Sequence, residues 1–503
     1  GMSAEYRDLP KLVGKLKLAA IDAYMVNKSR YKIDKRRNVY YESGNFGSQT
    51  MELTITRPGS NGEGGGVIQV RRDDGTFPQN GKFKEIRDDI DDIVEPWLDL
   101  PNPYSDSFNG KINEYREKVA AALSETSIEG LDPTTKTTDV STVKLQSFDK
   151  IAPGRMRTLL KGMNDYAPAL EGSAFNTFRA TFVTSMPSVI GNLALLARVH
   201  GETLLAEQLF LKQLRKKVVE AVEKATDAFE EIAEGEDGVG FEILLNILIW
   251  GCMAATVPGS GAAMAARIAG GASVPLTVLK DVSALKHDKT AGKATFEADN
   301  FEEMMKEFKR AFEEIGDDFK TAEEAVDENL RHNMKLVLED RARHGYTDTF
   351  FHLTPAPIQD AAGATRMDEN AVNQMTVGDG ATGGYMSQIA AELEEAAKAL
   401  TGISMVDLVR RKHKIGMGPT GPGGAFAELR QVLYELLQDL RWKVDEGNVN
   451  LRAAMRDFQE SDASSQKALD AVASNIAQGS GVDPWDHKKQ KEENLRPHSN
   501  GNV

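Results

Sequence analysis

The chain has 503 residues, a formal net charge of −15, 7% aromatic residues and a single cysteine, Cys252. This negative charge argues against general nucleic-acid binding, because affinity for phosphate needs clustered Lys and Arg. One cysteine excludes an intrachain disulfide framework and a zinc site built from several thiolates. The length allows two or three domains, and the abundance of Leu, Ala, Glu, Lys and Met favours a mainly α-helical fold.

Residues 1–126 are expected to form a small α+β part. Residues 10–25 carry apolar side chains on one side only, which predicts an amphipathic helix. Residues 51–56 alternate Met, Leu and Ile with Glu and Thr, which is typical of a strand. The other expected strands are residues 31–41 and 66–71, and the expected helices that follow are residues 82–98 and 111–123.

Residues 127–142 are polar and rich in turn-forming residues, so we expect a linker there. Residues 143–346, which begin with a helix at about 148–163, are expected to contain a long helical hairpin. Its arms, residues 187–234 and 300–344, would each be roughly 70 Å long. Apolar residues of the second arm recur at steps of four and three, as in a coiled coil: Phe301, Met305, Phe308, Phe312, Ile315, Phe319, Ala322 and Val326. We expect Phe312 to be buried against the first arm.

An apolar, Ala/Gly-rich insert, residues 241–283, joins the two arms. We expect it to be a helical hairpin, and the stretch from residue 243 to Pro258 is shorter than the about 20 residues that cross a bilayer. Two interpretations stay open: the insert is permanent core of the bundle, or it enters a membrane conditionally. The residues that carry both interpretations are Ile243, Leu244, Leu245, Ile247, Leu248, Ile249, Trp250 and Cys252.

The remainder of the chain is again expected to be helical. Residues 347–384 predict a loop-rich connection, because they contain Pro355, Pro357 and a Gly-dense end. Residues 385–478 predict a C-terminal helical hairpin, with helices at 385–400 and 425–478 around the loop 412–424. The tail, residues 479–503, has too few apolar residues to fold and is expected to be disordered. The whole is predicted to be an elongated helical bundle of long antiparallel helices.

No motif for catalysis, for a cofactor or for a metal is found, so an enzyme is not expected. The eight histidines are scattered without an HExxH pair, and His344 and His352 are expected to be solvated. Acidic clusters lie at 88–92, 313–318 and 323–328, and the last two are expected on a solvent-exposed helix face. The basic runs 212–217 and 410–414 could contact anionic lipid or an acidic partner.

Two long helices around an apolar Ala/Gly hairpin resemble the α-helical pore-forming toxins of the cytolysin A and haemolysin BL type. The resemblance covers about residues 187–344 and rests on the pattern of the segments. It implies that the apolar insert is hidden in the soluble form and released at a membrane.

The helical layout also resembles actinobacterial substrates of type VII (ESX) secretion, which are helical hairpins exported without a signal peptide. The resemblance implies that the segment from Phe458 to Asp462 (FQESD) is a variant of the Tyr-x-x-x-Asp/Glu export signal of that class. The Trp-x-Gly turn of the class is absent, since Trp442 is followed by Lys443 and Val444.

Three functions follow as hypotheses. The first is a non-enzymatic, secretion-associated or exported helical protein that binds protein partners or self-associates through its long helices. The second is a conditional membrane-inserting protein like the pore-forming toxins, and the third is an intracellular helical scaffold. We expect a secreted or cell-surface location without a cleaved signal peptide, or otherwise a cytoplasmic one.

Overall fold

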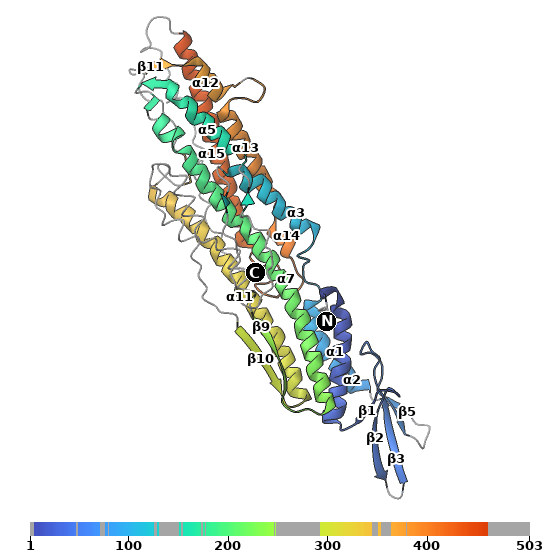
Figure 1. Ribbon diagram of the computed structural model, residues 1–503. Helices are drawn as coiled ribbons and strands as arrows, with labels where there is room; N and C mark the ends of the chain where they lie inside the picture. Colours follow the sequence, from blue (N-terminus) through green and yellow to red (C-terminus); the bar gives the residue numbers. More distant parts are fainter. Residues whose placement is uncertain are drawn as a thin grey trace.

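The computed structural model of the chain describes residues 5–46, 49–70, 76–78, 80–124, 128–129, 150–151, 154–172, 175–176, 178–245, 247, 292–344, 351–353, 364–378 and 380–460. The described part is mainly α-helical, with a small antiparallel sheet near the N-terminus, as the sequence predicts. In Figure 1 the sheet lies at one end of the molecule, and the long helices run from there toward the opposite end.

The N-terminal part combines a helix with a five-stranded sheet of order β1-β2-β3-β4-β5. One expected strand, residues 31–41, is wrong as a single element: a turn divides it, and Asn38 adopts a positive φ of 54° there. The elements are η1 (Tyr6–Asp8), α1 (Leu9–Ala23), η2 (Tyr24–Lys28), β1 (Lys32–Asp34), β2 (Val39–Phe46), β3 (Gln49–Thr56), β4 (Val67–Val70) and β5 (Thr76–Pro78). Tyr40 donates to the Asp22 carboxylate at 2.6 Å and so joins β2 to α1.

Short helices follow the sheet and lead to the first long helix. They are α2 (Asn80–Val94), η3 (Glu95–Trp97), α3 (Asp106–Tyr115), η4 (Arg116–Ala120), α4 (Ala121–Leu123), α5 (Met156–Tyr166), η5 (Ala167–Ala169) and η6 (Phe178–Val183). The helix expected from residue 148 begins only at Met156, because Lys150–Ile151 (β7) pairs with Ile128–Glu129 (β6) instead. That pair includes two residues of the expected linker, whose remainder lies outside the described residues.

The two long helices α7 (Met186–Glu234) and α11 (Phe301–His344) occupy the two predicted arms. α7 ends at Gly235, whose φ of 92° gives the left-handed cap that glycine adopts without strain. The rings of Phe229 and Phe301 lie 5.9 Å apart, which joins the end of α7 to the start of α11. Figure 1 shows the two helices side by side. We call this pair the spine.

The apolar insert begins as a strand, so the helix expected from Ile243 is wrong at its start. Val239–Leu245 (β9) pairs antiparallel with Gly292–Ala298 (β10), and the Phe241 and Phe296 rings stack at 4.9 Å. Val239, Phe241 and Ile243 are buried, whereas Gly240 and Glu242 are exposed. This period of two is that of a strand with one buried face, and the charge of Glu242 already breaks the apolar helical pattern.

The C-terminal part contains more structure than the sequence predicts. Within the expected loop 347–384 lie β11 (Ala364–Met367), which pairs with β8 (Leu170–Gly172), and α12 (Glu369–Thr376). The helices that follow are α13 (Tyr385–Thr401), α14 (Met405–Val409) and α15 (Gly423–Glu460). The predicted helix 425–478 is therefore described as far as Glu460, and the predicted tail 479–503 lies outside the described residues.

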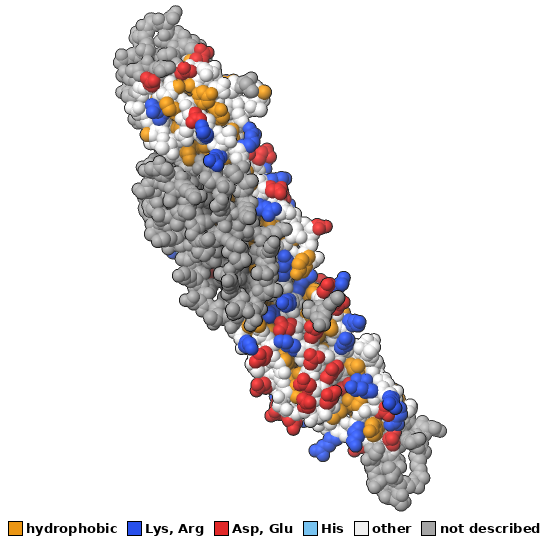
Figure 2. Space-filling view, in the orientation of Figure 1, with side chains coloured by type: hydrophobic (Ala, Val, Ile, Leu, Met, Phe, Trp, Pro, Cys, Tyr) orange, Lys and Arg blue, Asp and Glu red, His pale blue; other side chains and the backbone are white. Residues whose placement is uncertain are grey.

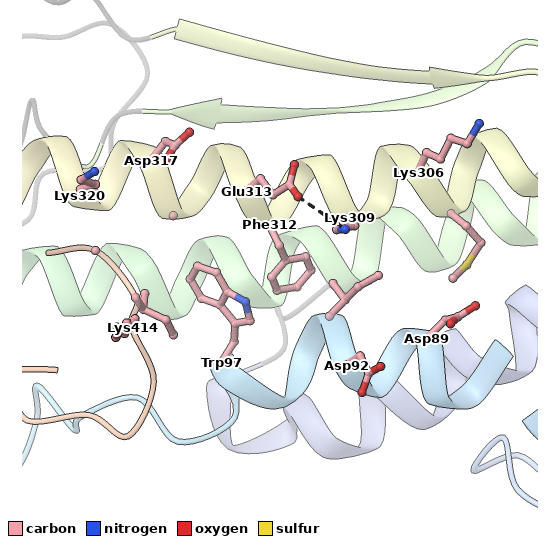
Figure 3. A pocket seen from close by; sticks show the side chains of 15 residues that line it. Asp89, Asp92, Trp97, Lys306, Lys309, Phe312, Glu313, Asp317, Lys320 and Lys414 are labelled. Carbon is pink, nitrogen blue, oxygen red and sulfur yellow. Dashed lines mark ion pairs between the residues drawn. The ribbon is translucent and has the colours of Figure 1, made fainter. Parts of the chain in front are cut away.

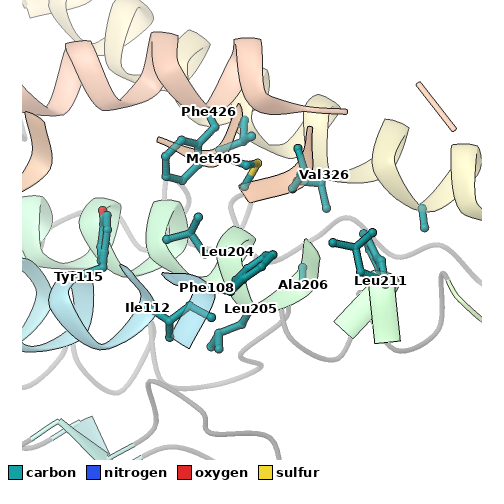
Figure 4. Packing of buried hydrophobic residues seen from close by; sticks show 14 of the residues in the cluster. Phe108, Ile112, Tyr115, Leu204, Leu205, Ala206, Leu211, Val326, Met405 and Phe426 are labelled. Atoms are coloured by element: carbon teal, nitrogen blue, oxygen red, sulfur yellow. The ribbon is translucent and has the colours of Figure 1, made fainter. Parts of the chain in front are cut away.

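One contiguous apolar core joins the spine to the helices on either side of it. Figure 4 shows Phe108 and Ile112 of α3, Leu204 and Leu205 of α7, and Met405 and Phe426 of α14 and α15 packed together. All six are nearly inaccessible to solvent. Burial of side chains of this size contributes about 1.5–3 kcal/mol each, so residues far apart in sequence fold as one unit.

Candidate functional site

A groove of about 760 Å³ lies between α2, α11 and the loop of residues 411–421, and we call it the α2–α11 groove. Figure 3 shows Trp97 and Phe312 between the two helices, with charged side chains of α11 along one wall and those of α2 along the other. The loop closes one end through Lys414, Ile415 and Gly416.

Aromatic and aliphatic side chains form the apolar floor of this groove. The Trp97 and Phe312 rings meet edge to face at 5.4 Å, and only 7% of the Trp97 surface and 3% of the Phe312 surface are exposed. Trp97 is placed there by η3, the short helix that continues α2 after Val94. Gly316 of α11 lies beside the indole, and a Cβ there would be in ordinary van der Waals contact with Trp97 at 3.4 Å. Phe312 was expected to be buried against the first arm; its burial is as predicted, and its ring contacts are with Trp97 and Phe308.

Charges of both signs line the rim of the groove. The α2 wall carries Asp89 and Asp92, and the residues of the α11 wall are Lys306, Lys309, Glu313, Asp317 and Lys320. The ion pairs on the α11 wall are long and exposed, with Lys309 4.0 Å from Glu313 and Lys320 3.8 Å from Glu324. Exposed pairs of this kind contribute about 0–1 kcal/mol, so the rim ammonium groups remain accessible to a carboxylate of another molecule.

The groove is apolar at its floor and charged at its rim. Its 15 lining residues include Asp, Glu and Lys, but no Ser, Thr, Cys, His or Tyr. Within the described parts of the chain, no group of three or more His, Cys, Asp and Glu could hold a metal ion. An apolar floor with charged rims is instead the general form of a protein-binding surface.

The loop at the end of the groove is anchored by a buried ion pair. Arg411 Nη2 donates to Glu323 Oε2 at 2.7 Å, and the Met417 backbone N–H donates to the same oxygen at 2.7 Å. Gly416 has a φ of 65° and lies against this oxygen, and any Cβ there would overlap it. The expectation that the acidic cluster 323–328 is solvated is therefore wrong for Glu323, which is fully buried.

Burial raises the pKa of Glu323, although Arg411 and the Met417 N–H act in the opposite direction. The Arg411 guanidinium also lies 4.9 Å from the centre of the Phe319 ring and donates through Nε to the Ile415 carbonyl at 2.8 Å. The same arginine thus joins the loop, through the Ile415 carbonyl, to Glu323 and Phe319 of α11.

A second buried polar contact joins α15 to the segment 351–353. His352 Nδ1 lies 3.3 Å from Asp439 Oδ2, and Lys443 Nζ lies 3.1 Å from the same oxygen. Burial lowers the pKa of His352 despite its contact with Asp439. The expectation that His352 is solvated is wrong, because only 2% of its surface is exposed.

The predicted site residues fall in several places. Ile243, Leu244 and Leu245 are in β9, and Ile247 is buried and donates its backbone N–H to Asp318 at 3.0 Å. Outside the described residues lie Leu248, Ile249, Trp250 and Cys252. Phe458 belongs to the last turn of α15, whereas Asp462 lies beyond the described residues.

The two basic runs are used largely for internal contacts. Lys212 lies 5.0 Å from the centre of the Tyr104 ring, and Arg215 lies 4.2 Å from that of Tyr6. In the other run Arg411 is buried and Lys412 pairs with Asp99 at 2.7 Å. Only Lys414 of that run lines the groove.

Sequence reasoning missed the α2–α11 groove. The available signals were a Pro-Trp pair directly after a helix and one glycine, Gly316, within a highly charged helix. Neither signal predicts that α2 and α11 lie opposite each other across a groove. No family model, curated protein or solved structure matches this chain.

Proposed function

We propose that the chain is a non-enzymatic binding protein, an elongated bundle of antiparallel helices that acts through the α2–α11 groove. The observation that carries the proposal is the groove itself, which has an apolar floor of Trp97 and Phe312 between two walls of accessible charged side chains. Buried aromatic anchors with a polar rim are the usual source of affinity and specificity in protein recognition.

The chemistry of the groove selects the kind of partner. A large apolar side chain fits over Trp97 and Phe312, where it would displace water from an apolar surface. At the end closed by the loop, Lys320 and Lys414 supply two ammonium groups, and Lys414 makes no ion pair among the described residues. The partner is therefore a protein segment that presents a large apolar side chain and, beside it, a carboxylate.

A peptide selection tests this proposal. A displayed library of random peptides is selected on the wild-type protein and on Lys320→Glu combined with Lys414→Glu. We expect the wild type to enrich peptides with a bulky apolar residue next to Asp or Glu, and the double variant to replace those acids by Lys or Arg. This reversal of the preferred peptide charge is expected because like charges across a desolvated contact suppress binding.

Lys335→Glu supplies the matched control. Lys320 and Lys335 both lie on α11 and both pair with a glutamate four residues later, with exposed side-chain fractions of 53% and 71%. Lys335 does not line the groove. The same peptides should therefore bind Lys335→Glu and wild type equally. Two results would contradict the proposal. One is enrichment of peptides that lack the apolar–acidic pair, and the other is an equal loss of peptide binding in the Lys335→Glu variant and in the Lys320→Glu, Lys414→Glu variant.

Export is a separate part of the proposal and is supported by the resemblance of Phe458 and Asp462 to the type VII signal. Fractionation of the native host tests it, since cytosol, culture fluid and membrane separate the exported protein from an intracellular scaffold and from a membrane protein. Recovery in culture fluid that is lost in Phe458→Ala would support export through this segment. Recovery of both forms in the cytosol alone would favour the intracellular scaffold.

A conditional membrane-inserting protein is the second candidate. It is favoured by the pairing of β9 with β10, which places both ends of the segment 246–291 beside the spine. By length and composition Phe178–Glu234 could itself cross a membrane, but 65% of its apolar window is buried within the molecule, as in the core helix of a protein that never meets lipid.

Thiol labelling at Cys252 separates the two candidates. A permanently buried thiol should stay unreactive with or without lipid vesicles. Insertion should change its reactivity only when vesicles and a trigger such as acid pH are present, together with leakage of the vesicles. Neutral lipids are included because a net charge of −15 disfavours anionic bilayers. Unchanged reactivity of Cys252 under every condition would rule out the membrane-inserting protein.

A further inference from the structure

A third charged group, Glu207 of α7, interacts electrostatically with the ion pair that anchors the loop 411–421. Its side chain is fully buried, and neither of its carboxyl oxygens has a hydrogen-bond partner among the described residues. The charged groups that act on it are Glu323 from α11 and Arg411 from the loop. The next charged pair along α7, Arg198 and Glu202, is joined at 2.8 Å and is neutral as a pair.

Two buried carboxyl groups therefore face one buried guanidinium, which pairs with only one of them. Arg411 is committed to Glu323 at 2.7 Å, so it neutralises that carboxylate and leaves Glu207 uncompensated. An uncompensated buried charge is far more costly than a buried neutral carboxyl. The cluster is electroneutral only while one proton remains on it, and Glu207, which accepts no hydrogen bond among the described residues, is the group that holds this proton.

We propose that Glu207, Glu323 and Arg411 form a proton-dependent latch: with one proton on the cluster the loop 411–421 is held in place, and loss of that proton releases it. The loop carries Lys414, Ile415 and Gly416, so the latch controls one end of the α2–α11 groove. Its importance for binding rests on the proposed function, whereas its existence does not.

The direction of the pH dependence follows from linkage. Burial, and then the charge of Glu323, raise the pKa of Glu207 well above its ordinary value in the closed arrangement. Once the loop opens and water enters, that pKa returns toward about 4.3. The closed arrangement is thus fully favoured below the ordinary glutamate pKa and is progressively lost as the pH rises toward the raised value. Opening should increase by about tenfold per pH unit in that window, because one proton is released.

Hydrogen–deuterium exchange of the loop measures this opening without any partner. The Met417 amide is a direct reporter, since it donates to Glu323. Exchange is followed from pH 5 to pH 8 and corrected for the intrinsic pH dependence of amide exchange. We expect the corrected opening of the loop to increase by about tenfold per pH unit. Flat corrected exchange across this range would overturn the latch.

Three variants sharpen the measurement. Glu207→Gln imitates the protonated carboxyl and should keep the loop protected at every pH. Glu323→Gln removes the carboxylate that pairs with Arg411 and should leave the loop open at every pH. The control is Glu230→Gln, an exposed glutamate of the same helix α7, which should titrate like wild type. A Glu207→Gln variant that retains the wild-type pH slope would overturn the assignment of the proton.

Infrared spectroscopy of the wild type provides a measurement that needs no variant. A protonated carboxyl should remain detectable at pH 6, where ordinary glutamates are ionised, and should disappear over the pH range in which the loop loses protection. Absence of this signal at pH 6 would contradict the latch. Failure of the peptide selection with a pH-dependent loop would overturn the groove as a docking site and leave the latch standing.

Discussion

Two regions along the spine both contain buried side chains, but of different chemical types. Near the end that carries the five-stranded sheet, Phe229 packs on Phe301 and Phe308 packs on Phe312, and the charged residues of α11 are at the surface. Figure 2 shows acidic and basic side chains covering the molecule around this end of the spine. Farther along, Glu207, Glu323 and Arg411 are buried within it. We call these the aromatic region and the charged region.

This difference shows that burial alone does not say how a region is stabilised. The aromatic region is stabilised by removal of apolar surface from water, which does not depend on pH and depends little on salt. Each ion of the charged region is desolvated and tolerated only with its partner. Truncation of a side chain should therefore destabilise the aromatic region. The charged region should instead be destabilised by removal of an ion-pair partner or of the proton.

The charged region is broken most directly by Arg411→Ala. This change leaves Glu323 buried without its partner, so we expect a loss of about 3–5 kcal/mol of unfolding free energy. Urea unfolding at pH 7 measures it. Arg410 is the natural control, because its contact with Asp407 is 4.0 Å long and exposed; Arg410→Ala should change stability by less than about 0.5 kcal/mol. Equal effects of the two changes would mean that Arg411 is solvated.

A cavity in the aromatic region should lower the free energy of unfolding by about as much as Arg411→Ala does. Phe308 is fully buried and packs edge to face on Phe312 at 5.1 Å. Phe308→Ala should cost about 3–5 kcal/mol, with no dependence on pH between 5 and 8. Met305→Ala removes a half-buried side chain one turn earlier and should cost clearly less. A value below about 1 kcal/mol for Phe308→Ala would place this ring in solvent.

Gly416→Ala should have an intermediate effect. The backbone at residue 416 is left-handed, and a new Cβ would overlap Glu323 and lie 2.8 Å from the Phe319 ring. Strain of this kind costs about 1–3 kcal/mol. Gly424→Ala is the control, because a Cβ there meets nothing within 4 Å. Equal melting temperatures for Gly416→Ala and Gly424→Ala would indicate that the loop does not pack on Glu323.

The smallest effect is expected at the surface of the spine. Lys320→Glu and Lys335→Glu each replace an exposed lysine in a weak ion pair. Each should change the free energy of unfolding by less than about 0.5 kcal/mol. Thermal unfolding of both variants checks this, and a large loss in Lys320→Glu alone would show that this lysine contributes to folding as well as lining the groove.

The sequence predicts the aromatic region far better than the charged region. Phe301, Phe308, Phe312 and Phe319 follow a helical period, so α11 and its buried face can be read from spacing alone. Glu323 occupies a position that the same period assigns to solvent, and its burial depends on Arg411, 88 residues later. No local pattern signals such a pair.

Two other features, β9 and the floor of the groove, also depend on contacts between residues far apart in the sequence. The sequence predicts a helix at β9 because Ile243, Leu244 and Leu245 form a continuous apolar run, and only pairing with β10 determines the strand conformation. The floor of the α2–α11 groove combines Trp97 with Phe312, which are separated by more than two hundred residues. Local periodicity identifies each element, but not the contacts between distant ones.

We propose that α7 and α11 form one antiparallel spine along which both regions and the groove are arranged. Distances between paired spin labels test it, with Cys252→Ser as background and labels on exposed positions of α7 (Glu230→Cys) and α11 (Lys306→Cys or Lys335→Cys). The 230–306 pair should give a short distance, and the 230–335 pair a distance roughly 40 Å longer, as the rise of the helix requires. Two similar distances, or a longer one for the 230–306 pair, would contradict the antiparallel spine.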